Sequence, residues 1–273
     1  MLDALEEAHS VQCRPVQPLY DPAVATAELR DWVSSARRGN PWRYRPARGE
    51  VEIAPLVSPL RLDVTLRQDF FSLYAEQREL YRTDFGSFAA RARQHDYFVW
   101  FERIMCPSWQ PHVLADPASF DAAWAARLRA SAALYESFER RGFDERSPIT
   151  LYEARRVLPT SAGKRVGRTI YAGDGNHRLA LLMTAGQTTL LPSQYRVKRF
   201  RTLVPGDTTG RLVEALAIDL QRYVAFLATG YPSLRIEVAG GRIEVGGSAD
   251  RTLLEEVRSV VRIDMPDLEG EPT

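Results

Sequence analysis

Lysine is nearly absent from this sequence of 273 residues, in which Lys164 and Lys198 are the only two examples. Arginine therefore supplies almost all of the positive charge. A GC-rich coding sequence produces such a bias, so the number of lysines says little about function. Their placement is more informative, because both lie close to the motif described below.

Cysteine is also scarce, with Cys13 and Cys106 as the two examples. This excludes a disulfide scaffold, and no Cys/His cluster has the spacing of a zinc site. No uncharged apolar run reaches the roughly 18 residues of a transmembrane helix. The acidic N-terminus lacks the basic region and apolar run of a signal peptide. The sequence therefore predicts a cytoplasmic protein with no membrane partner.

Net charge is small, because 36 basic residues face 35 acidic ones and leave a formal +1. This balance argues against a surface built throughout for nucleic acid or for an anionic membrane. The aromatic and basic segment around Trp42 and Tyr44 leaves local nucleic-acid binding open. Packing of its rings on the body of the protein is the simpler interpretation.

Hydrophobic periodicity predicts an α+β protein with four regions. They are an N-terminal arm with a helix (1–50), a helical region (51–124), a small mixed sheet (125–204) and a C-terminal helix with a β-hairpin (205–273). Apolar alternation predicts extended chain over 51–66. Helical spacing predicts a helical stretch over 70–81 and helices over 23–38, 85–105, 117–141 and 212–227. Short strands are expected at 149–152, 169–172 and 194–200, a polar loop at 161–167 and a hairpin at 234–246.

One short motif points to chemistry: Gly173-Asp174-Gly175-Asn176-His177-Arg178, between a predicted strand and a predicted helix. Gly173 and Gly175 permit a positive φ and the close approach of a ligand. The first N–H groups of the helix lack internal partners and carry the positive end of the dipole, so this is an anion site. Arg178 can grip a phosphate, and His177 can donate to a phosphate oxygen or move a proton. Asp174 can hold a metal, orient His177 or accept a hydroxyl proton.

The residues Asp174-Gly-Asn-His-Arg178, with Gly186 ending the next helix, resemble the signature turn of the ParB/sulfiredoxin superfamily. The upstream stretch from Tyr135 to Ile149 is similar to the helix, loop and first strand that precede that turn. The resemblance covers residues 125–204 and implies a small mixed sheet whose turn holds nucleotide phosphates. Within the superfamily, ParB hydrolyses CTP, sulfiredoxin uses ATP, and a third branch phosphorylates free serine. That third branch has Asp-Gly-His-His-Arg in its turn, which is closest to this sequence.

The sequence differs from the three branches of the superfamily in ways that favour one of them. Asn176 stands where sulfiredoxin has its cysteine, which argues against sulfiredoxin chemistry, and neither the Glu-Arg-Arg turn nor the helix-turn-helix of ParB is evident. The serine-phosphorylating branch has an upstream catalytic glutamate. Glu136 and Glu153 are the nearest candidates for it here, and Asp121 is a weaker one.

The lysine-bearing loop 161–167 connects the two strands that lead into the turn. Lys164 and Arg165 could close over bound phosphates from this loop, although a solvated hairpin loop explains them equally simply. No G-x-x-x-x-G-K-[ST] loop, protein-kinase signature set or G-x-S-x-G elbow occurs.

These features predict a nucleotide-dependent phosphotransferase acting on a small hydroxyl-bearing metabolite. The cofactor would be ATP or ADP, with CTP as an alternative, and Mg²⁺ would sit at Asp174. Phosphate would be held at Gly173, Gly175, Asn176, His177 and Arg178, while Asp174 and an upstream carboxylate would handle the proton. Two other classes remain open: a CTP- or ATP-binding regulatory or DNA-associated protein, and a ParB-like nuclease.

Overall fold

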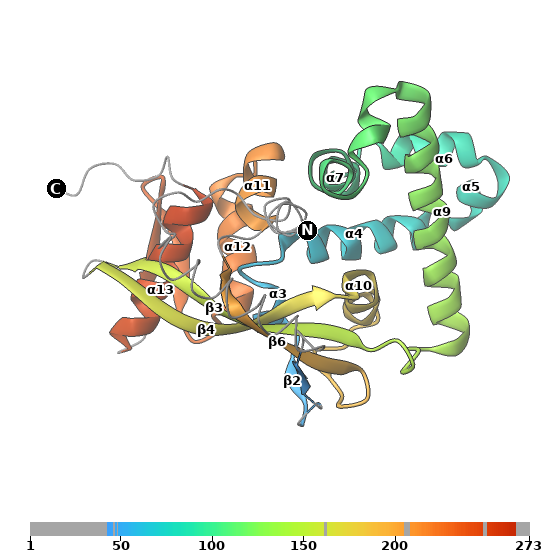
Figure 1. The fold of residues 1–273 in the computed structure, drawn as a ribbon. Coiled ribbons are helices and arrows are strands. Elements are labelled where there is room, and N and C mark those ends of the chain that lie inside the picture. Colours follow the sequence, from blue (N-terminus) through green and yellow to red (C-terminus); the bar gives the residue numbers. More distant parts are fainter. Residues whose placement is uncertain are drawn as a thin grey trace.

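A computed structural model describes residues 43–45, 47, 49–160, 163–204, 208–247 and 250–265 (Figure 1). Side chains are described within these ranges except at 43–45, 154–160, 163–168 and 199–204 and at Thr208. The helix expected over 23–38 and the ring of Trp42 lie outside the described residues. Helices and small sheets together confirm the α+β class, while the ParB/sulfiredoxin topology stays a prediction.

A four-stranded sheet carries the motif. Its strands lie in the order β1 (Arg43–Arg45), β6 (Tyr195–Val204), β3 (Ile149–Thr160) and β4 (Gly163–Asp174). β3 and β6 run parallel, and the other pairs are antiparallel. Two smaller sheets pair β2 (Val51–Glu52) with β5 (Thr189–Leu190), and β7 (Arg235–Ala239) with β8 (Arg242–Gly246). The second of these confirms the hairpin expected at 234–246.

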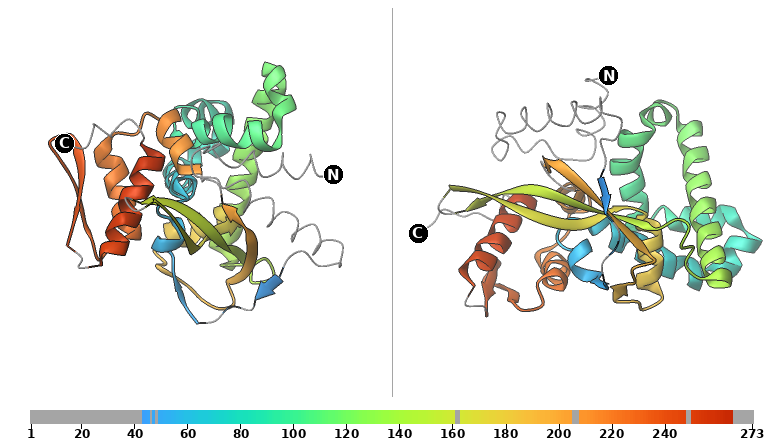
Figure 2. Two further views of the ribbon diagram at one scale, coloured as in Figure 1. Left: turned by 60° about the vertical axis from the view of Figure 1, so that its left-hand side comes forward. Right: turned by 60° about the horizontal axis from the view of Figure 1, so that its bottom comes forward.

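The polar loop expected at 161–167 is wrong for its described part. Gly163 already pairs with Thr160, and β4 continues without a break in register as far as Ala172. β3 and β4 therefore form one long hairpin, which in Figures 1 and 2 extends past helix α13 (Arg251–Asp264). Short polar and glycine-rich stretches are typical of loops, but a long antiparallel ladder accommodates them because each residue gains its backbone hydrogen bonds there.

The extended chain expected over 51–66 is also wrong beyond β2. Residues Ala54–Val57 form α3, and Leu62–Glu76 form α4. α4 is buried on most of its circumference: Leu62, Val64, Leu66, Phe70, Phe71 and Tyr74 are each at most 4% exposed. A helix that is buried on more than one side has no single apolar stripe at helical spacing, so the leucines and valine at the start of α4 mimic the alternation of a strand.

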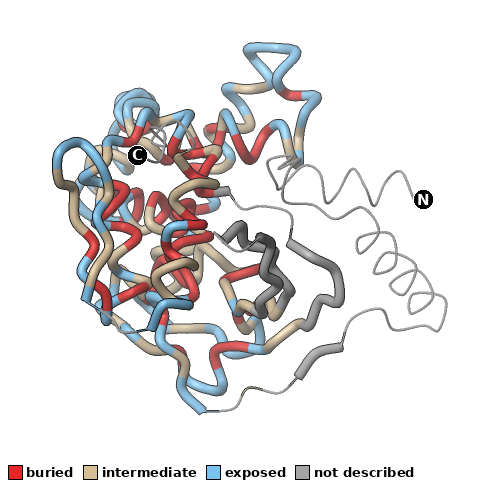
Figure 3. The backbone as a smooth tube through the Cα atoms, turned by 90° about the vertical axis from the view of Figure 1, so that its left-hand side faces the viewer, coloured by how far each residue is buried: buried red, intermediate tan, exposed pale blue. Residues whose placement is uncertain are grey.

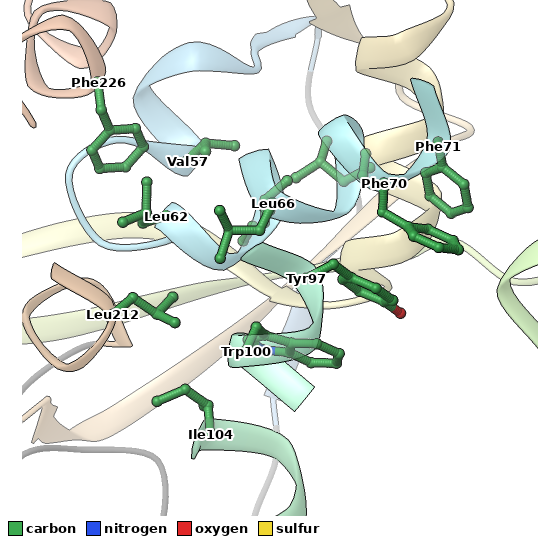
Figure 4. Close-up of a cluster of buried hydrophobic side chains, with 14 of the residues drawn as sticks. Val57, Leu62, Leu66, Phe70, Phe71, Tyr97, Trp100, Ile104, Leu212 and Phe226 are labelled. Atoms are coloured by element: carbon green, nitrogen blue, oxygen red, sulfur yellow. The ribbon is translucent and has the colours of Figure 1, made fainter. Parts of the chain in front are cut away.

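The long helix expected over 85–105 is divided into shorter pieces. The pieces are α6 (Phe85–Ala92), α7 (Asp96–Trp100) and a π-helical turn (Phe101–Met105). They are preceded by α5 (Arg78–Thr83) and followed by α8 (Cys106–Trp109) and a 3₁₀ turn (Pro111–Ala115). His95 caps the break before α7, since its Nδ1 accepts from the Tyr97 amide at 3.1 Å. The break turns the aromatic residues of α7 toward α4 (Figure 4), where Tyr97 stacks between Phe70 and Trp100.

The third helix is confirmed at both ends. α9 (Pro117–Arg141) begins at Asp116, whose carboxylate accepts from the Ala118 and Ser119 amides, and it ends at Gly142 with φ +71°. The helix expected over 212–227 is instead two helices, α11 (Thr208–Ala215) and α12 (Leu220–Gly230). Ala217 between them has φ +46°, which no helix accommodates.

Buried hydrophobic side chains form one cluster from Ile53 to Val260 (Figure 3). The boundary expected near residue 125 falls inside α9, so the helical region and the sheet share a continuous core. Within this core α4 lies against α10 (Asn176–Thr184), the helix that follows the motif turn (Figure 1).

Candidate functional site

The motif turn sits between the end of β4 at Asp174 and the start of α10 at Asn176. Gly175 occupies the left-handed region with φ +88°, a conformation that favours glycine. No side chain caps this helix start, so Asp174 is not the N-cap of α10. The first N–H groups of α10 therefore remain available to an anion.

Gly173 is needed for a different reason from the expected positive φ. A Cβ at this position would lie 2.5 Å from the Tyr152 ring, so only glycine lets that ring lie against the strand. The hydroxyl of Tyr152 reaches Asp174 and is hydrogen-bonded to its carboxylate. Burial, followed by the negative charge of Asp174, raises the pKa of Tyr152 above its usual value. Tyr152 thus stays protonated and donates to the exposed carboxylate.

Two cations share this face of the sheet with Tyr152. Lys198 is the register partner of Tyr152 on β6, and its Nζ lies 5.6 Å from the centre of the ring. Burial, and then Arg196, lowers the pKa of Lys198, whereas the nearby Asp174 raises it. Arg196 lies next to Lys198 along the same face and donates from Nε to Thr150 Oγ1 at 3.1 Å. Asp174 therefore lies among cations.

Arg178 adds a third cation from the first turn of α10. Its guanidinium folds back over Gly175, where a Cβ would lie 2.9 Å from Nη2. Among the described residues, the buried Nη1 has no hydrogen-bond partner. Burial lowers the pKa of Arg178 most strongly and Arg196 adds to this, while Asp144 and Asp174 oppose it. A buried donor without a partner is costly, and an anionic oxygen would satisfy it.

Asn176 holds the turn closed. Its Nδ2 donates to the Gly173 carbonyl at 2.8 Å, and its buried Oδ1 has no partner among the described residues. The same turn is fixed from outside by Arg61, at the N-terminus of α4. Arg61 Nη1 donates to the carbonyls of Ala172 at 2.6 Å and Gly173 at 3.3 Å.

Arg61 is itself held by a buried ion cluster. It pairs in a bidentate manner with Asp63, which also pairs with Arg67. Burial alone would raise the pKa of Asp63, but Arg61 and Arg67 together lower it well below its usual range. The end of β4 is thus tied to the core through charges on α4.

His177 does not lie where a phosphate ligand would need it. A 2.7 Å hydrogen bond joins its Nε2 to the hydroxyl of Tyr97, which also contacts Ser131 Oγ at 3.0 Å. The rings of Phe71, Tyr97 and Trp100 meet the imidazole edge-on. Burial, and then Arg67 and Arg127, lowers the pKa of His177 well below its usual range. The side chain is a neutral anchor between α10 and α7.

The upstream carboxylates are not gathered at the turn. Glu136 accepts from the Tyr74 hydroxyl at 2.8 Å and pairs with Arg78 and Arg82. Asp121 pairs with Arg93 on the helical side of the molecule. Glu153 follows Tyr152 on β3 and therefore lies on the opposite face of the sheet from Asp174.

Lys164 and Arg165 are likewise distant from the turn. Lys164 precedes Asp174 by ten residues of one strand, which corresponds to about 33 Å at ~3.3 Å per residue. Tyr152 and Arg196 are not among the site residues expected from the sequence, and Lys198 was expected close to the motif without a role in it. Their spacing of two along strands that border the motif is the signal that places them on one sheet face.

No protein-family model matches this chain, and neither does any curated protein or solved structure. In the described part of the chain, no helix is long and apolar enough to cross a membrane. Over the same residues, no three His, Cys, Asp or Glu side chains gather as a metal site. The site is therefore defined by its own geometry: an uncapped helix start, three cations and one exposed carboxylate.

Proposed function

We propose that this protein is a nucleotide-dependent phosphotransferase acting on a small hydroxyl-bearing metabolite. The observation that carries the proposal is Arg178, whose buried Nη1 lacks a partner at an uncapped helix start beside Asp174. Arg67, Arg78 and Arg127 also have a buried Nε without a hydrogen-bond partner among the described residues, so the place of Arg178 at the helix start is what favours a ligand oxygen for its Nη1. The resemblance of the turn to the ParB/sulfiredoxin superfamily supports a nucleotide as the source of that oxygen.

Phosphate binding uses the backbone and Arg178 together. The first amides of α10 and the Arg178 guanidinium meet the phosphate oxygens, and Lys198 and Arg196 add positive charge from the sheet. Phosphoryl transfer depends mainly on positioning and charge neutralisation, which these groups supply. His177 contributes only by anchoring α10 to Tyr97.

Asp174 serves as the base for the acceptor hydroxyl. The Tyr152 hydroxyl donates one hydrogen bond to the Asp174 carboxylate, whose other lone pairs can accept from a second donor. In the transfer step the acceptor oxygen forms a bond to the phosphorus, the bond from phosphorus to the leaving nucleotide breaks, and the hydroxyl proton passes to Asp174. Glu136 and Glu153, once candidates for this role, are engaged elsewhere or lie on the other face.

Mg²⁺ fits this site as an ion shared with the nucleotide. Magnesium usually takes one or two protein carboxylates together with substrate phosphates, and Asp174 is an exposed carboxylate in the required place. Bound there, the ion would neutralise phosphate charge. It would also remove the repulsion between Asp174 and the phosphates.

The test separates binding from turnover in Asp174→Asn. We expect nucleotide affinity to persist in calorimetry, while single-turnover phosphoryl transfer to a pool of hydroxy-metabolites falls by about 10²-fold or more. Asp121→Asn is the matched control, since Asp121 is an exposed carboxylate that pairs with Arg93 on the helical side of the molecule, away from the turn. Near wild-type turnover in Asp174→Asn would remove the proposed base and, with it, the phosphotransferase assignment.

A pure nucleotide-binding switch is the second candidate. The serine-phosphorylating branch that the turn resembles uses an additional catalytic glutamate. Here Glu136 pairs with Arg78 and Glu153 lies on the other face of the sheet from Asp174, which favours a switch without catalysis. Nucleotide binding without any product in the mass spectrum of the wild-type incubation would select this candidate.

A further inference from the structure

Positive charge is concentrated in the four-stranded sheet. Its strands contain two acidic residues, Glu153 and Asp174, and eleven basic ones: Arg43, Arg45, Arg155, Arg156, Lys164, Arg165, Arg168, Arg196, Lys198, Arg199 and Arg201. The sheet strands thus carry a formal +9. Since the whole chain carries +1, all remaining residues together carry −8. The near-neutral net charge of the chain is therefore the sum of a strongly basic sheet and an acidic remainder.

The end of the β3–β4 hairpin away from the motif carries positive charge without any negative charge. Residues 154–160 and 163–168 contain five basic residues and no acidic one. The register places them on both strands: Arg155 opposite Arg168, Leu158 opposite Arg165 and Pro159 opposite Lys164. We name residues 154–160 and 163–168 the basic hairpin. In Figures 1 and 2 it reaches past α13, on the side of the molecule away from α9.

We propose that the basic hairpin binds the phosphate backbone of duplex nucleic acid without reading base sequence. A two-stranded β-ribbon is one of the elements that the major groove admits. The seven residues of β3 in the basic hairpin, 154–160, span about 23 Å at ~3.3 Å per residue. Each DNA strand presents a charge about every 3.4 Å, so this length matches about seven phosphates of a linear polyanion.

This interaction is independent of the proposed phosphotransferase site. Lys164 lies about 33 Å along β4 from Asp174, as described above. Variants in the basic hairpin therefore leave the turn intact. A linear polyanion is favoured over a membrane surface because the charges are distributed over both strands and both faces of an extended ribbon instead of lining one face of an amphipathic helix.

The experiment measures binding of the full chain to a fluorescent 24-base-pair DNA duplex of mixed sequence by anisotropy, at salt concentrations from 50 to 200 mM. If the five basic residues each meet a phosphate, affinity falls with a log–log slope of about −4.5, or about 10²–10³-fold over this range. The test variant is Lys164→Gln/Arg165→Gln/Arg168→Gln. We expect it to lose about tenfold or more in affinity at 50 mM salt and to flatten the slope by about 2–3.

A control variant removes the same amount of charge elsewhere. Arg91, Arg242 and Arg251 are exposed and lie outside the four-stranded sheet, so Arg91→Gln/Arg242→Gln/Arg251→Gln should retain wild-type binding. Circular dichroism checks that both variants fold. The proposal is overturned if both variants weaken binding equally, if the wild type does not bind the duplex at 50 mM salt, or if phosphatidylserine vesicles compete the duplex away at matched charge.

Discussion

His177 offers the sharpest test of how the motif is built, because the sequence predicts a phosphate ligand and the structure places a neutral anchor. Burial and the positive charges of Arg67 and Arg127 lower its pKa well below the ordinary value. As pH falls, the unfolded chain therefore takes up the proton before the folded one. The free energy of unfolding is fully retained above the unfolded pKa near ~6.5 and is lost below it.

The size of the effect follows from the linkage relation. With the folded pKa well below the ordinary value, the loss contributed by His177 between pH 7.5 and pH 5.5 reaches at most about 1.4 kcal/mol. His177→Gln keeps a polar group for the Tyr97 hydroxyl but cannot titrate. The variant should lose up to about 1.4 kcal/mol less than the wild type over this interval, and its nucleotide affinity at pH 7.5 should stay within about twofold.

The assay is urea unfolding followed by tryptophan fluorescence at both pH values, for the wild type, His177→Gln and His95→Gln. His95 is included because burial also lowers its pKa, so its titration adds a loss of the same sign. Comparison of the two single variants with the double variant shows how much of the pH-dependent loss of stability each histidine contributes. An unchanged pH dependence in His177→Gln, or a large drop in its nucleotide affinity, would refute the assignment of a neutral structural role.

Three further predictions concern the neighbours of His177 in the site. Arg178→Ala should lose roughly 1.5–3 kcal/mol of nucleotide affinity in calorimetry while its thermal midpoint changes little, since a hydrogen bond to a charged group is removed. Gly175→Val should lower both thermal stability and nucleotide binding, because its φ of +88° strains any branched residue and its Cβ would meet Arg178; an unaffected melting curve would contradict this. Asp63→Asn should cost about 3–5 kcal/mol in urea unfolding, since it leaves Arg61 and Arg67 without their buried partner.

Local signals in the sequence located the elements that depend on short-range chemistry. Asp116 with Pro117 and Gly142 define α9, and the glycines at 240 and 241 define the β7–β8 hairpin. The motif turn was found in the same way, since the left-handed Gly175 and an uncapped helix start are set by adjacent residues. These features need no knowledge of distant contacts.

Features that depend on tertiary packing were predicted wrongly. The first half of α4 was expected to be extended, because its buried residues Leu62, Val64 and Leu66 alternate like those of a strand. The second half of α4 and α5 confirm the helical stretch expected over 70–81. The inward orientation of His177 depends on Tyr97, 80 residues earlier in the chain, and on the aromatic rings around it. Glu136 is held by Tyr74 and Arg78, which no spacing rule connects to it.

The hydrogen bonds from Arg61 to Ala172 and Gly173 have a consequence for association between molecules. β4 is an outer strand of its sheet, and an outer strand presents carbonyls that another chain can pair with. At the motif end of β4, the Arg61 guanidinium already occupies two of these acceptors. A foreign strand would therefore have to displace the Arg61 guanidinium before it could pair with these two carbonyls.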